Sequence, residues 1–125
     1  MRRIRSLRLV NGDGVDYLYK STDRSVFARL LEKRGECDDV LIVRDGWVTD
    51  TSFTNVVFED AGGGLYTPET CLLEGTRRQS LLDEGRIQAC PIRVEDIRYF
   101  RRVFLVNAMI GIEDEISVPV VNIVE

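Results

Sequence analysis

The sequence predicts one α/β domain of the mixed α+β kind, in which a mixed sheet with hairpins is combined with two or three helices. Three observations lead to this prediction. The chain has 125 residues and a hydrophobic share of 44%, which is enough for one packed core. Short apolar runs end at glycine-containing turns, as strands do, and other stretches have helical patterning. No repeat, low-complexity tract or linker divides the chain, so residues 1–125 are expected to form a single domain.

The N-terminal part is expected to contain two extended pieces followed by a helix. Apolar and polar residues alternate on both sides of the turn sequence at residues 11–14, which predicts two extended pieces within residues 5–20. Residues 23–33 carry apolar side chains at helical spacing, and Gly35 follows as a stop signal.

The middle of the chain is typical of strands joined by tight turns. Asp45-Gly46 is the dipeptide of two-residue hairpins, and residues 61–64 form a second glycine-rich turn. Pro68 ends the last of these strands, because proline cannot donate to a strand ladder. The expected strands are residues 40–43, 47–50, 52–58 and 65–67.

The C-terminal part alternates between helical and extended patterns. A helix over residues 76–84 has Gly85 as its stop signal. The remaining expected elements are a strand at residues 87–94, a short helix near residues 95–100, a strand at residues 103–107 and an extended, β-branched tail at residues 116–124.

Composition excludes several classes of function. With 17 basic and 21 acidic residues the net charge is −4, which argues against a nucleic-acid partner. No apolar run approaches the length that crosses a bilayer, so no membrane partner is expected. The chain has no histidine, which excludes Ser-His and Cys-His nucleophile pairs, histidine-ligated zinc and imidazole acid-base chemistry.

Amines and thiols are few. Lysine occurs only at Lys20 and Lys33, so a role that needs an amine has two candidates. Cys37, Cys71 and Cys90 are odd in number and form no C-x-x-C pair, which favours neither a disulfide framework nor a thiolate metal site. We therefore expect no bound metal, and we expect the protein to lie in the reducing cytoplasm. The basic first residues are not followed by an apolar stretch of secretory length, so no targeting segment is expected.

Two charged groups each have two interpretations. The arginines among residues 2–8 could form a phosphate or nucleic-acid patch, but they alternate with apolar residues as the solvated face of an edge strand does. The carboxylates at residues 113–115 could bind a cation, but they lack a glycine-bearing loop pattern and are more typical of a solvated turn. The solvated interpretation is favoured for both.

A spread set of residues points to one cofactor. Lys20 lies at an expected strand-to-helix junction, Asp50 at the end of a hairpin strand, and Gly75-Thr76-Arg77 open a helix. Each alone is an ordinary turn or capping residue. Together they supply an amine for a Schiff base, a carboxylate for a pyridine nitrogen and helix-start N–H groups for a phosphate. Those are the groups that pyridoxal 5′-phosphate requires.

Four segments, in chain order, are similar to motifs of one enzyme family. Residues 19–24 (YKSTDR) resemble its lysine motif, and residues 45–55 (DGWVTDTSFTN) resemble its dG-x-v-t-E-x-x-x-x-N signature. Residues 67–68 (TP) together with residues 73–78 (LEGTRR) resemble its TP … LL-x-G-x-x-R block. Residues 106–109 (VNAM) resemble the c-N-a-l/m segment of its lyase branch. Over residues 17–110 the chain thus resembles the class IV fold of pyridoxal-phosphate enzymes. That family comprises branched-chain aminotransferases, D-amino-acid aminotransferases and aminodeoxychorismate lyases.

The resemblance implies a role for each matching residue. Lys20 would be the catalytic residue, which forms the Schiff base and moves a proton at the substrate α-carbon. Asp50 would face the pyridine nitrogen in a place where the family usually has glutamate, so its carboxylate is one methylene shorter. The residues assigned to the cofactor are Lys20, Asp50, Asn55, Gly75, Thr76, Arg77, Asn107 and Ala108.

The resemblance also implies a function and a domain arrangement. We expect a pyridoxal-phosphate-dependent aminotransferase or aminodeoxychorismate-lyase-like enzyme, with an amino acid or keto acid as its small-molecule partner and a homodimer as its assembly. Only residues 1–19 precede Lys20, whereas the family has a further N-terminal domain, so the chain resembles the C-terminal, cofactor-binding domain of the D-amino-acid aminotransferase-like fold. Activity is expected to need that absent domain. The alternative is a truncated, inactive remnant, or one half of a split enzyme, that binds no cofactor alone.

Overall fold

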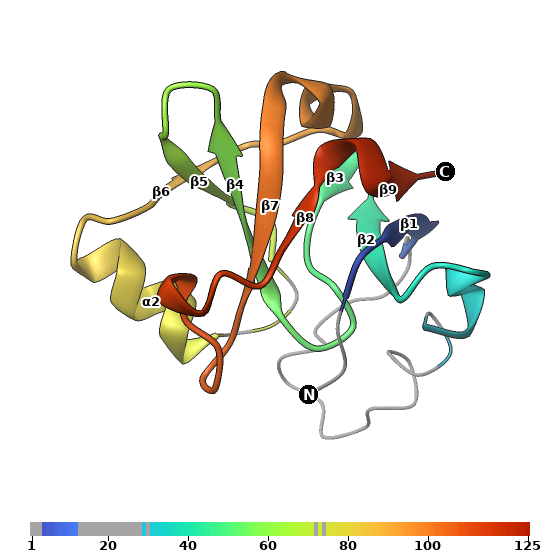
Figure 1. Ribbon diagram of the computed structural model, residues 1–125, viewed down its shortest axis with the longest axis horizontal. Helices are drawn as coiled ribbons and strands as arrows, with labels where there is room; N and C mark the ends of the chain where they lie inside the picture. Colours follow the sequence, from blue (N-terminus) through green and yellow to red (C-terminus); the bar gives the residue numbers. More distant parts are fainter. Residues whose placement is uncertain (1–3, 13–28, 30, 72, 74) are drawn as a thin grey trace.

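The computed structural model describes residues 4–12, 29, 31–71, 73 and 75–125 (Figure 1). These residues form two β-sheets, short 3₁₀-helices and an α-helix, α2 (Thr76–Asp83). The mixed α+β fold class is therefore confirmed, with the strands divided between two mixed sheets. None of the helices in the described part of the chain is long and apolar enough to cross a membrane.

The first sheet has the strand order β3-β2-β1-β9. Its strands are β1 (Leu7–Asn11), β2 (Asp39–Arg44), β3 (Trp47–Val48) and β9 (Ile123–Val124). Strand β1 lies parallel to both β2 and β9, whereas β2 and β3 form an antiparallel hairpin. At the hairpin turn Asp45 and Gly46 have φ angles of 52° and 84°, the positive values that a type I′ turn needs. The hairpin predicted at this dipeptide is confirmed.

The second sheet has the strand order β6-β5-β4-β7-β8. Its strands are β4 (Asn55–Asp60), β5 (Leu65–Pro68), β6 (Gln88–Cys90), β7 (Phe100–Val106) and β8 (Ser117–Pro119). Strands β5 and β6 are parallel and the other neighbours are antiparallel. Asn55 is paired with Val106, so the first residue of β4 lies beside the last residue of β7. This register places the start of β4 and the end of β7 side by side.

The two sheets are joined along both edges. Beyond β6, the N–H of Val48 donates to the Ile92 carbonyl at 2.9 Å, and the N–H of Val94 donates to the Gly46 carbonyl at 3.2 Å. On the opposite edge the 3₁₀-helix η5 (Val120–Asn122) carries the chain from β8 into β9, as Figure 1 shows. The sheets therefore enclose a shared core.

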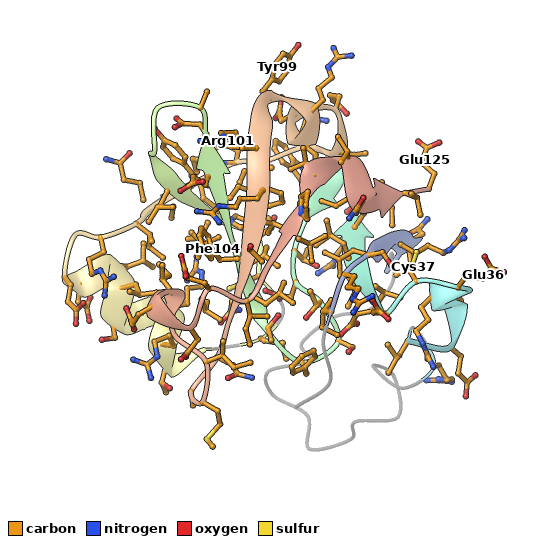
Figure 2. All side chains as sticks on the ribbon, in the orientation of Figure 1. Glu36, Cys37, Tyr99, Arg101, Phe104 and Glu125 are labelled. Carbon is orange, nitrogen blue, oxygen red and sulfur yellow. The ribbon has the colours of Figure 1, made fainter. Side chains whose placement is uncertain are left out.

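Side chains alternate between two cores along β4 and β7. Val56 and Phe58 face the first sheet, whose Leu7 and Leu41 are fully buried against them. Val57 of β4 and Phe104 of β7 face the other side, where they pack with Leu81 of α2. Figure 2 shows Phe104 on the α2 side of β7. The second sheet thus separates the core between the sheets from a smaller core under α2, as period-two alternation requires.

Several predicted elements agree with the structure, and others are shortened. The helix expected at residues 76–84 is α2, and the short helix expected near residues 95–100 is the 3₁₀-helix η3 (Val94–Tyr99). The strand expected at residues 87–94 is divided, because after β6 the chain leaves β5 and pairs with β3 through Arg93. The strand expected at residues 52–58 begins only at Asn55.

The elements predicted at the two ends of the chain agree with the structure only in part. The expected tail at residues 116–124 is extended in β8 and β9 but is interrupted by η5, which follows Pro119. Of the helix expected at residues 23–33, the structure describes its end, where η2 (Glu32–Arg34) is followed by Gly35 with a φ of 62°. The extended piece before Lys20, and Lys20 itself, lie outside the described residues.

Candidate active site

A buried carboxylate, Asp50, stands at the centre of the candidate site. Its side chain is 1% exposed, and both of its oxygens accept hydrogen bonds. Oδ1 accepts from Asn55 Nδ2 at 2.9 Å, and Oδ2 accepts from the main-chain N–H of Leu73 at 3.0 Å. Donors of this kind favour the ionised carboxylate over the acid. The two donors therefore fix the orientation of the Asp50 side chain.

A bulge after β3 sets the direction of Asp50. The N–H of Thr49 donates to the Ile42 carbonyl at 2.9 Å, and the N–H of Ile42 donates to the Asp50 carbonyl at 2.8 Å. Two residues thus lie opposite one residue of β2, which is the pattern of a β-bulge. The bulge explains why regular pairing of β3 ends at Val48 although the predicted strand runs to residue 50.

A closed turn at residues 51–54 brings Asn55 back toward Asp50. The N–H of Thr51 donates to the Thr54 carbonyl at 3.1 Å, the N–H of Thr54 donates to Thr51 Oγ1 at 3.0 Å, and the two hydroxyl oxygens are 2.6 Å apart. Both threonines are buried. The turn replaces the first residues of the predicted strand, because their hydrogen bonds are made locally.

Asn55 joins Asp50 to the segment that enters α2. Its Nδ2 donates to Asp50 and also to the Leu73 carbonyl at 3.0 Å. Its Oδ1 lies against the backbone of Gly75, where an added Cβ would stand only 1.7 Å away. Gly75 has a φ of −84°, so glycine is needed here for space and not for an unusual backbone angle.

The N-terminus of α2 lies directly after this contact. Gly75 is its N-cap, and glycine has no side chain with which to cap the first turn. The first N–H groups of a helix have no intrahelical partners and carry the positive end of the helix dipole. Because Thr76 and Arg77 contribute these groups, the helix start is of the kind that binds phosphate.

A second turn is fastened beside the start of α2. Arg77 donates through Nε to the Asn107 carbonyl at 3.4 Å and through Nη2 to the Ala108 carbonyl at 3.3 Å. Asn107 Oδ1 accepts the N–H of Met109 at 2.8 Å, which closes the turn. Asn107 Nδ2 also donates to the Phe53 carbonyl at 3.5 Å. The segment after β7 is therefore held to both α2 and the turn after Asp50.

The structure brings together every predicted cofactor residue that it describes. The connected residues are Asp50, Asn55, Gly75, Thr76, Arg77, Asn107 and Ala108. Lys20 is outside the described residues, so its position relative to them stays a prediction. The role of each residue toward a cofactor also stays a prediction.

Two contributors were not assigned a role from the sequence. The Leu73 N–H holds Asp50, but a main-chain amide carries no residue identity that a motif could reveal. Arg78 donates through Nε to Thr67 Oγ1 at 3.3 Å and through Nη2 to the Pro68 carbonyl at 3.0 Å, which fastens α2 to the end of β5. Its signal was present, because the arginine ends the matched block that begins at the Thr-Pro pair.

One described member of each charged group with two interpretations takes a structural position. Arg8 donates to the carbonyls of Arg34 and Glu125 at 3.0 and 2.9 Å, so it ties η2 to the C-terminus. Glu113 forms an exposed ion pair with Arg86 at 3.2 Å. Among the described residues no group of three or more histidine, cysteine, aspartate or glutamate side chains is placed to hold a metal ion.

A thiol and a guanidinium outside the candidate site have shifted pKa values. Burial raises the pKa of the Cys90 thiol, and the negative charges of Glu69 and Asp96 add to this effect. The hydrogen bond from Arg102 to Glu59 raises the pKa of that guanidinium; Nε and Oε1 are 2.8 Å apart. Neither group belongs to the candidate site, so neither shift bears on its chemistry.

Comparison with known proteins places the chain in a family. The family model described as "Amino-transferase class IV" matches residues 2–114. The chain belongs to the class IV aminotransferase family. An uncharacterized protein of Haemophilus influenzae is 43% identical over 108 residues, which cover 86% of this chain and 57% of that protein. This class IV chain thus spans little more than half the length of that relative.

Two solved structures resemble this class IV chain. A structure from Haemophilus somnus, described as a "putative 4-amino-4-deoxychorismate lyase", is 38% identical with a TM-score of 0.82, over 89% of this chain and 57% of that one. A hypothetical aminotransferase from Mycobacterium tuberculosis, in a PLP-bound form, is 20% identical with a TM-score of 0.67, over 86% of this chain and 45% of that one. The second likeness shows the fold alone.

Proposed function

We propose that this chain is the cofactor-binding part of a pyridoxal-phosphate enzyme of the aminotransferase or aminodeoxychorismate-lyase kind, which acts on amino acids. One observation carries the proposal. The buried Asp50 carboxylate is held by Asn55 and by the Leu73 N–H immediately before the start of α2. A fixed carboxylate and a helix N-terminus are thus adjacent, as a ring nitrogen and a phosphate on one small molecule require.

The donor and acceptor groups of the site fit this cofactor. When bound, pyridoxal phosphate supplies an aldehyde that reacts with amines and a ring that withdraws electrons from the substrate α-carbon. Asp50 would accept the N–H of the pyridine ring, since a carboxylate can accept about four hydrogen bonds and can serve Asn55, Leu73 and the ring at once. The N–H groups at the start of α2 and the turn at Ala108 would face the phosphate.

Lys20 is proposed as the residue that handles protons. It would take the proton from the substrate α-carbon and deliver it at C4′ of the cofactor. For this step the amine must be neutral at the working pH, so its pKa must lie below the ~10.4 of an ordinary lysine. Asp50 would stay ionised throughout and would keep the ring nitrogen protonated.

The lyase branch receives the more specific support. The lyase-described structure from Haemophilus somnus is 38% identical, and residues 106–109 resemble the lyase segment. Release of pyruvate from aminodeoxychorismate would identify a lyase, whereas transfer of the amino group to a keto acid would identify an aminotransferase. The proposal further includes a homodimer, a cytoplasmic setting, which suits three cysteines that form no disulfide, and a need for a further N-terminal domain for activity.

The test of this proposal is whether pyridoxal phosphate forms a covalent adduct with Lys20. The purified chain is mixed with pyridoxal phosphate, its absorption spectrum is recorded, borohydride is added and the reduced adduct is located by mass spectrometry. We expect one adduct on Lys20, lost in Lys20→Ala and retained in Lys33→Ala, which removes the only other lysine. No adduct on an accessible Lys20 would contradict the proposal and favour an inactive remnant, or one half of a split enzyme, that binds no cofactor alone. Equal labelling of both lysines would also contradict it.

A further inference from the structure

We propose that Asn55 is a positioning residue for the ring nitrogen of the cofactor, and that it acts through Asp50 without touching the cofactor itself. The inference rests on the proposed function and deepens it. It also changes the role that the sequence assigns to Asn55, which was counted among the residues that bind the cofactor.

The side-chain amide of Asn55 has two acceptors on one side. Its Nδ2 is 2.9 Å from Asp50 Oδ1 and 3.0 Å from the Leu73 carbonyl oxygen. An amide nitrogen carries two N–H groups, so both bonds form at once. Since both partners are acceptors, the nitrogen must face them and the oxygen must face away. A carboxylate in place of this amide would set oxygen against oxygen at both contacts.

The remaining side of the amide is closed by Gly75. A Cβ at this position would lie 1.7 Å from Asn55 Oδ1 and 2.9 Å from its carbonyl carbon. Any other residue at position 75 would therefore displace the amide from Asp50. Space for Asn55 is the reason for glycine at the N-cap of α2.

The backbone of Asn55 is fixed as well. It is 2% exposed, begins β4 and is paired with Val106 of β7. A rigid strand thus carries an amide that holds Asp50 on one side and the entry to α2 on the other. An acceptor that is already in place when the ring arrives needs no reorganisation.

The orientation of the Asp50 carboxylate is set by its neighbours. Asn55 and the Leu73 N–H each hold one of its oxygens. Loss of the Asn55 donor is therefore expected to weaken the contact at the ring nitrogen in particular.

The experiment compares two ligands that differ only at that atom. Equilibrium binding of pyridoxal phosphate and of its carbocyclic analogue, in which C–H replaces the ring nitrogen, is measured for the native chain, Asn55→Asp and Asn55→Ala. We expect the native chain to prefer pyridoxal phosphate by about tenfold or more, as for a hydrogen bond to a charged group. In both variants the preference should fall to near unity.

The matched control is Asn122→Asp, which makes the same chemical change at an exposed asparagine that donates to the Arg5 carbonyl. Its preference should equal that of the native chain. If Asn55 only supported the fold, its variants would weaken both ligands equally and leave the preference unchanged, and that result would overturn the inference while the proposed function stood.

A second measurement needs no ligand. Thermal unfolding is followed for Gly75→Ala, Asn55→Ala and the double variant. We expect Gly75→Ala to lower the midpoint less in the Asn55→Ala background, where the obstructing oxygen is gone, and equal losses would contradict the contact. If the native chain bound neither ligand, the proposed function would fail and the role at the ring nitrogen with it, whereas this cycle would still report on the Asn55–Gly75 contact.

Discussion

The main-chain N–H of Leu73 donates to Asp50 Oδ2 at 3.0 Å, although the two residues are 23 positions apart in the chain. The carboxylate that ends the first hairpin is thereby joined to the segment that starts α2. This bond therefore joins two of the three segments that form the candidate site.

Removing the charge of Asp50 while keeping its shape is the most direct prediction. In Asp50→Asn an NH₂ group would face one of the two donors that now meet a carboxylate oxygen. We expect a loss of about 1–3 kcal/mol in the free energy of unfolding, measured by urea denaturation, and loss of pyridoxal phosphate binding. Asp83→Asn, at an exposed position of α2, should change stability by less than ~0.5 kcal/mol. Full stability and full cofactor binding in Asp50→Asn would contradict the role of the carboxylate.

The guanidinium of Arg77 is predicted to hold the turn after β7. Arg77→Ala removes its bonds to the carbonyls of Asn107 and Ala108, so the amide of Met109 should exchange hydrogen faster. The bonds are long and partly exposed, hence the loss of stability should stay below ~1 kcal/mol. Arg86→Ala, which removes an exposed ion pair, is the control and should leave this exchange rate unchanged. An unchanged rate in Arg77→Ala would show that the turn holds itself.

The hairpin turn after β2 offers a conformational test. Gly46 has a φ of 84°, so Gly46→Ala is expected to lower the free energy of unfolding by about 1 kcal/mol. Gly62 is the control: its φ is not in the positive region, and a Cβ there would meet its nearest neighbour at an ordinary 3.6 Å. Gly62→Ala should be neutral or slightly stabilising. Equal effects of the two substitutions, measured by thermal unfolding, would argue against backbone strain in Gly46→Ala.

The raised pKa of Cys90 predicts the pH dependence of its reactivity. The thiolate is the nucleophile, and the folded protein keeps this thiol protonated above its ordinary range. The midpoint of the rise in the Cys90 alkylation rate with pH, followed by peptide mass spectrometry, should therefore lie above ~8.5. Glu69→Gln should move the midpoint down, by less than the whole shift because burial is the larger cause. A midpoint at the ordinary thiol value would refute the prediction.

Elements with local signals could be predicted from the sequence. The helix α2 begins at Thr76 as expected, because its glycine flanks and composition act within a few residues. The turn at Asp45-Gly46 is equally local, since the two positive φ angles suit those residue types. The motif matches also identified the family, and the structure then brought together the matched residues that it describes.

Other features depended on contacts that no local pattern encodes. The strand expected through residue 50 gives way to a bulge, and the strand expected from residue 52 gives way to the hydroxyl pair of Thr51 and Thr54. Alternation of side chains predicts an extended chain, but it does not say where the ladder is interrupted. The division of the strands into two sheets was likewise absent from the pattern.

By itself the sequence determined the fold class, the family and the residue types available for chemistry, including the absence of histidine and the presence of only two lysines. Only the tertiary structure decided that Asn55 contacts Asp50, Leu73 and Gly75 together. The physical reason is that the contacts of Asn55 with Leu73 and Gly75 involve a main-chain carbonyl, and the space left by a missing side chain, in a segment about 20 positions away. Main-chain amides and carbonyls are the same in every residue, so their partners become known only when the chain has folded.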